Sequence, residues 1–108
     1  MSGELRFSWL ADNGAIINWW SGDIARDPKR FVHNEWGKFA AAVDLGRREA
    51  QILFNEPSER HVIKFAEITD ENSRLALEAA CDAREAAFTA ELLMRVIGRD
   101  DMADRMAR

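Results

Sequence analysis

The chain has 108 residues, with 15 Lys and Arg against 19 Asp and Glu and a hydrophobic fraction of 47 %. This length fits one domain and excludes a large two-domain enzyme, and the composition excludes an intrinsically disordered chain. No apolar run approaches the roughly 18 residues of a membrane span, and the first residues do not resemble a secretory signal. We therefore expect a cytoplasmic protein without a membrane partner, and the single cysteine, Cys81, agrees with a reducing compartment.

Two segments rich in β-branched and aromatic residues flank an Asn-Gly pair near the start of the chain. Residues 5–10 and 15–20 are typical of strands. The pair Asn13-Gly14 predicts a tight hairpin between them, because a type I′ turn needs positive φ at both central residues. One face of the hairpin would carry Leu5, Phe7, Trp9, Ile16 and Trp20, and the other Arg6, Ser8, Leu10, Ile17 and Trp19. The second face is half polar, so we expect Trp19 to lie on the less apolar side.

A helix is predicted over residues 27–45. Asp27 followed by Pro28 is typical of an N-cap and a first helical residue. Apolar residues then recur at helical spacing, and Gly46 is a plausible end signal. The repeating residues are Val32, Trp36, Phe39 and Val43.

A second hairpin is predicted from residues 49–55 and 61–68, with a five-residue loop between them. The alternative is that the preceding helix continues to Asn55, because Val43, Ala50 and Phe54 keep helical spacing. The strand interpretation is favoured.

The C-terminal third predicts one long helix. Thr69 is a good N-cap, and no Gly or Pro interrupts the sequence until Gly98. At about 1.5 Å per residue this helix would span roughly 43 Å, whereas a compact domain of this size is on the order of 34 Å across. We therefore expect a homodimer that covers the overhanging apolar stripe, although the chain's own sheet is an alternative cover. The stripe consists of Ala76, Ala80, Ala83, Ala87, Ala90, Met94 and Ile97.

No combination of residues points to catalysis or to a cofactor. The two histidines and one cysteine lack zinc-ligand spacing, and no phosphate-binding or nucleophile motif is present. Glu78, Asp82 and Glu85 form a carboxylate column, for which a solvated helix face is the favoured interpretation over a cation site. We expect no enzyme activity, no metal and no cofactor.

Two residue groups are candidates for binding. The favoured interpretation of the four tryptophans is a packed core, and because tryptophan is enriched in interface hot spots they are also possible anchors for a partner or walls of a small-ligand pocket. They are Trp9, Trp19, Trp20 and Trp36. A basic segment, residues 26–48, holds five residues that could contact phosphate, although a solvated helix surface is the favoured interpretation. These are Arg26, Lys29, Arg30, His33 and Lys38.

The elements together predict an α+β fold in the order ββ-α-ββ-α, with one small antiparallel sheet packed against two helices. We expect a single domain over residues 1–98 and a polar tail over residues 99–108. The favoured function is a non-enzymatic protein that binds another protein as a regulator, inhibitor or assembly subunit. The alternatives are a nucleic-acid-binding module that uses residues 26–48, and a small-molecule binder or enzyme with a Trp-lined pocket.

Overall fold

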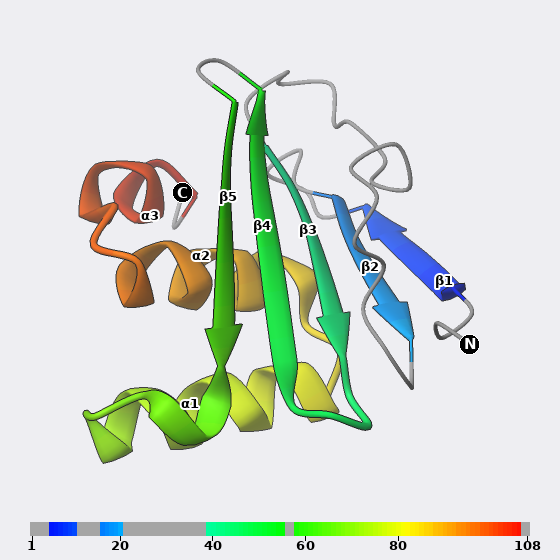
Figure 1. The fold of residues 1–108 in the computed structure, drawn as a ribbon, viewed down its shortest axis with the longest axis horizontal. Helices are drawn as coiled ribbons and strands as arrows, with labels where there is room; N and C mark the ends of the chain where they lie inside the picture. The colour runs from blue at the N-terminus through cyan, green and yellow to red at the C-terminus, as the bar shows by residue number, and fades with distance from the viewer. Residues whose placement is uncertain (1–4, 11–15, 21–38, 56–57, 107–108) are drawn as a thin grey trace.

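The computed structural model describes residues 5–10, 16–20, 39–55 and 58–106. Within these ranges the chain forms an α+β fold, with strands followed by helices (Figure 1). The strands are β1 (Leu5–Leu10), β2 (Ile16–Trp20), β3 (Phe39–Asp44), β4 (Glu49–Asn55) and β5 (Ser58–Lys64). The helices are the 3₁₀ helix η2 (Phe65–Glu67) and the α-helices α1 (Glu71–Asp82), α2 (Ala86–Val96) and α3 (Asp100–Met106). In the view of Figure 1, α1 and α2 lie behind the strands, and α3 lies to the side, beyond the outer edge of β5.

The strands form one mixed sheet in the order β1-β2-β3-β4-β5. All neighbouring pairs are antiparallel except β2 and β3, which run parallel. The predicted purely antiparallel sheet is therefore wrong. Parallel neighbours need a connection of a dozen or more residues, and residues 21–38 are long enough to provide one.

The first two strands lie close to their predicted positions, but their register differs. Leu10 pairs with Ile16 and Phe7 pairs with Trp19, instead of the predicted pairs of Leu10 with Ile17 and Ser8 with Trp19. A shift of one residue exchanges the two faces of a strand. Ile17 and Trp19 are consequently fully buried, and the prediction that Trp19 lies on the less apolar side is wrong.

Residues 39–44 form strand β3, whereas the sequence predicted the end of a helix. Every residue of β3 is buried, including Asp44. A strand buried on both faces has a continuous apolar sequence, and the run Phe-Ala-Ala-Ala-Val fits that pattern as well as it fits a helix. Gly46 lies in the exposed turn between β3 and β4, and residues 27–38 of the predicted helix lie outside the described residues.

The predicted strand over residues 49–55 is confirmed as β4, and the alternative of a continued helix is wrong. Its partner β5 begins at Ser58, earlier than predicted, and gives way to η2 at Phe65. Among the described residues β5 pairs only with β4, so it is an edge strand.

The predicted long C-terminal helix is wrong, because the chain turns after α1 and again after α2. Arg84 has a φ of 54° and Gly98 a φ of 82°, so both adopt the left-handed conformation. At each turn a 6→1 and a 5→2 backbone hydrogen bond form a Schellman motif: Glu85 donates to Ala80, and Arg99 donates to Met94. Gly98 is the usual residue at such a position, whereas Arg84 carries the cost of a side chain there.

The chain breaks after α1 because the buried sides of α1 and α2 would point in nearly opposite directions along one continuous helix. At about 100° per residue, Leu77 and Leu93 would lie about 160° apart around one continuous helix. Both are fully buried in the structure, whereas Phe88, which would share the side of Leu77, is 43 % exposed. One straight helix cannot place both sides against the same sheet, and two shorter helices can.

Residues 100–106, part of the predicted polar tail, form α3. Met102, Ala103 and Met106 are buried and belong to the same core cluster as Ile52 and Leu93. The C-terminal segment is therefore held by apolar burial in the core.

We predict that Arg84→Gly is more stable than Arg84→Ala by about 1 kcal/mol, because glycine adopts the left-handed conformation without steric cost. Both variants lose the same guanidinium group, so their difference reports on the backbone alone. Urea unfolding of the two purified variants measures it.

A helix that continued through residue 84 would reverse the order, with alanine favoured by about 1 kcal/mol. The matched control is Ala79→Gly in the middle of α1, which is expected to destabilise by a similar amount.

Candidate functional site

The residues predicted to form a dimer surface do not form one continuous stripe. Ala80, Ala90 and Met94 are buried in the chain's own core, and Ala83 is exposed at the C-cap of α1. The other three are half-buried: Ala76, Ala87 and Ile97. The predicted dimer depended on a single long helix, so this argument for it no longer holds.

The tryptophan and basic candidates fall largely outside what the structure describes. Trp19 is a core residue of β2, and its buried indole N–H has no hydrogen-bond partner among the residues that the structure describes. Trp9 and Trp20 lie in β1 and β2. The remaining candidates lie outside the described residues: Trp36, Arg26, Lys29, Arg30, His33 and Lys38.

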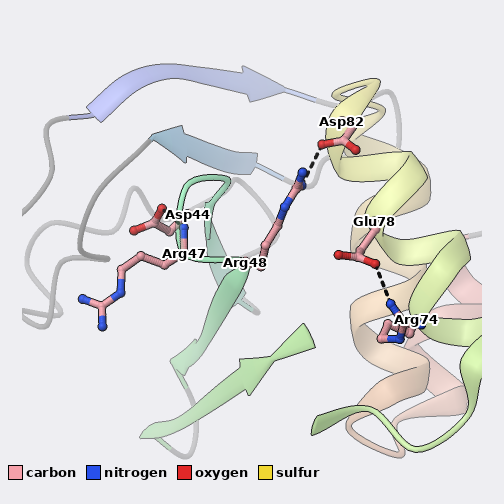
Figure 2. Close-up of polar contacts among 6 residues, drawn as sticks. All are labelled: Asp44, Arg47, Arg48, Arg74, Glu78 and Asp82. Atoms are coloured by element: carbon pink, nitrogen blue, oxygen red, sulfur yellow. Dashed lines mark hydrogen bonds and ion pairs between the residues drawn. The ribbon is translucent and has the colours of Figure 1, made fainter. Parts of the chain in front are cut away.

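Two carboxylates of the predicted column form ion pairs with arginines (Figure 2). Glu78 accepts a hydrogen bond from Arg74 at 3.0 Å, within α1. Asp82, at the end of α1, accepts one at 2.7 Å from Arg48 in the turn between β3 and β4. This contact raises the pKa of the Arg48 guanidinium. The Arg48–Asp82 ion pair connects the β3–β4 turn of the sheet to the end of α1, which is a structural role.

Cys81 is buried in the core on the inner side of α1. Burial raises the pKa of its thiol to about 12, and the neighbouring Thr89 side chain opposes that rise. A thiol that stays protonated near neutral pH is a poor nucleophile. The geometry therefore supports a packing role for Cys81.

A groove of about 510 Å³ runs between the edge strand β5 and the C-terminal end of α2. We call it the β5 groove. Its remaining wall comes from the segment that leads from η2 into α1. The lining residues are Val62, Ile63, Lys64, Glu67, Ile68, Thr69, Asp70, Ser73, Leu92, Arg95, Val96 and Ile97.

The groove combines an apolar lining with a free strand edge. Five of its lining residues are aliphatic and wholly or partly buried: Ile63, Ile68, Leu92, Val96 and Ile97. Val62, on β5, is 54 % exposed. Edge strands offer N–H and C=O groups that no neighbouring strand has satisfied. The groove can therefore accept both backbone hydrogen bonds and apolar side chains.

Asp70 lies at the end of the groove where α1 begins. It is the N-cap of α1, one residue later than the predicted Thr69, and it accepts a hydrogen bond from the backbone N–H of Ser73 at 3.2 Å. The Ser73 hydroxyl donates a second hydrogen bond to the same carboxylate. These bonds, the hydroxyl's first, lower the pKa of Asp70. The Asp70 carboxylate therefore serves to cap the N-terminal end of α1.

The two cationic groups of the groove differ in whether they form ion pairs with the described residues. Arg95 pairs with Glu91 and Asp104, at 3.2 and 3.0 Å. Lys64, at the end of β5, is exposed and forms no ion pair with the described residues. Lys64 is therefore a cation on the edge strand that can meet an incoming anionic group.

An aromatic cluster supports the other half of β5. Phe54 and His61 meet edge to face with ring centroids 5.7 Å apart. The guanidinium of Arg99 lies over the Phe54 ring at 5.1 Å, which is a cation–π contact. The loop between α2 and α3 is thereby tied to the β4–β5 hairpin, which keeps β5 in place beside the groove.

Comparison of the chain with family models, curated proteins and solved structures finds no match. None of the helices in the described ranges is long and apolar enough to cross a membrane. The β5 groove is therefore the feature of the described residues that bears on function.

We predict that the Cys81 thiol of the folded protein reacts with a disulfide reagent at pH 8 about a thousandfold more slowly than a free thiol. The pKa of about 12 leaves little thiolate at this pH, and burial blocks access. Absorbance of the released reporter measures the rate. The denatured chain, which is expected to react at the rate of a free thiol, is the control; fast reaction of the folded chain contradicts burial.

We predict that the cap formed by Asp70 stabilises the protein at neutral pH and loses this effect in acid. Because the folded pKa lies below the unfolded one, the contribution is complete above the unfolded pKa and disappears as the pH falls through the folded pKa. Asp70→Asn keeps a capping side chain but does not titrate. Unfolding curves over this range should show the wild type losing stability relative to the variant, and parallel pH profiles would contradict the role of the carboxylate.

Proposed function

We propose that this protein acts without catalysis, by binding an extended segment of another protein as an additional strand beside β5. The observation that carries the proposal is the β5 groove, where a free strand edge lies next to an apolar depression. In this mode of recognition, main-chain hydrogen bonds to the edge provide affinity and pockets for alternate side chains provide specificity.

The arrangement of the groove suits a strand better than a helix. Successive side chains of a strand point to opposite faces, so every second side chain of an added segment would lie over the helix side of the sheet. That side holds Leu92 and Val96 of α2 together with Ile68. The segment would cover these partly exposed aliphatic groups while its backbone pairs with β5.

The proposal gives a physical basis to the favoured sequence interpretation of a protein that binds another protein as a regulator, inhibitor or assembly subunit. It replaces the helix stripe with an edge strand as the binding surface. The nucleic-acid and Trp-pocket alternatives stay predictions from the sequence, since no feature of the described residues favours either of them.

We predict that linear peptides selected from a random displayed library for binding to the wild type lose their affinity for Val96→Arg. The long charged side chain would fill the groove beside β5, and we expect a loss of at least about tenfold. Leu75→Arg is the matched control, because Leu75 is 51 % exposed on α1 and does not line the groove. Fluorescence anisotropy of labelled peptides measures both affinities.

Hydrogen exchange adds a backbone measurement to the same experiment. Bound peptide should protect β5 amides that exchange in the free protein, because the added strand supplies their missing acceptors. Peptides that bind both variants equally, or that protect no β5 amide, would contradict strand addition at this groove.

A further inference from the structure

The outer face of β5 carries a row of two cations around an apolar residue. Ile63 belongs to the core beneath the helices, so Val62 and Lys64, its neighbours in the strand, point to the opposite face. Arg60 shares that face by the same alternation. All three residues are exposed, Val62 to 54 %.

We infer that the segment recognised by β5 is acidic, with two carboxylates flanking an apolar residue at alternate positions; this inference rests on the proposed function. In a paired strand, directly opposite side chains on one face lie close enough to interact, and opposite charges stabilise the pair. Carboxylates opposite Arg60 and Lys64, with an aliphatic residue opposite Val62, match the row in charge and polarity. Because one cation lies on each side of Val62, the order of charged and apolar side chains is the same in either chain direction. The match therefore holds for a parallel and for an antiparallel segment.

The two cations differ in what they can contribute. Arg60 already takes part in an interaction within the chain, whereas Lys64 forms no ion pair with the described residues. The larger share of the charge preference is therefore assigned to Lys64.

The preference is local and does not arise from the charge of the whole molecule. The chain carries a net charge of −4, which repels an acidic peptide at long range. Any gain for an acidic segment has to come from contacts at the strand edge. Such exposed pairs are screened by salt, so the preference should shrink as ionic strength rises.

The test uses three synthetic peptides that differ only in two side chains. The acidic probe has the core Leu-Glu-Leu-Val-Leu-Glu-Leu between Gly-Ser ends, and the other two carry lysine or glutamine in place of both glutamates. A fourth peptide is the acidic probe with its backbone N–H groups methylated at alternate residues, which removes the hydrogen bonds of an added strand. Isothermal titration calorimetry at low and high salt measures the affinities.

The acidic probe is expected to bind about tenfold more tightly than the lysine probe at low salt, as two cross-strand ion pairs would produce. Lys64→Glu should reverse most of this preference and Lys64→Gln should reduce it, with a smaller effect from Arg60→Glu. Arg47→Glu, which changes the net charge equally in the turn between β3 and β4, is the control and should leave the preference intact. Circular dichroism confirms that each variant is folded.

The remaining outcomes separate the two proposals. If all three probes bind equally and the methylated peptide does not bind, strand addition stands and the acidic preference is overturned. If none of the probes binds, or the methylated peptide binds as well as its parent, strand addition itself is overturned. A preference for the acidic probe that survives both Lys64→Glu and Arg60→Glu would also overturn the assignment to this row.

Discussion

The fold depends on a conflict of helical phase in the C-terminal third of the chain. The buried sides of α1 and α2 would point almost in opposite directions along one straight helix, so the chain has to break between them for both to face the sheet. Arg84 in the left-handed conformation makes that break, and Gly98 makes the next. The turn at Arg84 brings the end of α2 and the start of α1 to the same edge of the sheet, where together with β5 they line the groove.

The sequence predicted local elements better than the way in which they fit together. The α+β class and the strands β1, β2 and β4 could be recognised, because β-branched and aromatic runs near turn residues leave few alternatives. β3 could not, since Phe-Ala-Ala-Ala-Val carries no polar residue to reveal a period of two. The break at Arg84 lacked a Gly or Pro signal. Its one trace in the sequence was the breadth of the apolar face, which includes both Leu77 and Leu93 and is too wide for one helix to bury.

The groove could not have been found from residue types. Sequence reasoning selected tryptophans, cations and an alanine stripe because each has a distinctive side chain, whereas the groove is lined by Ile63, Ile68, Leu92 and Val96, which look like ordinary core residues. Its most specific property, the free edge of β5, belongs to the backbone and depends on strand order. The row of Arg60, Val62 and Lys64 was visible in principle. It was missed because the predicted strand began at residue 61, which placed Arg60 in a loop.

The row that we propose to recognise an acidic segment would also disfavour the pairing of β5 with β5 of a second copy. In an antiparallel pair of edges centred on Val62, Arg60 would lie opposite Lys64 of the second copy, and like charges in that position are destabilising. Moving the centre to His61 would instead place Glu59 opposite Ile63, a carboxylate against an aliphatic side chain. Charged residues at sheet edges commonly prevent such association. The charges on β5 thus disfavour pairing with a second copy of this chain, but they do not disfavour pairing with a strand of different charge. For this physical reason we propose that a segment of a different protein pairs with the edge beside the apolar groove.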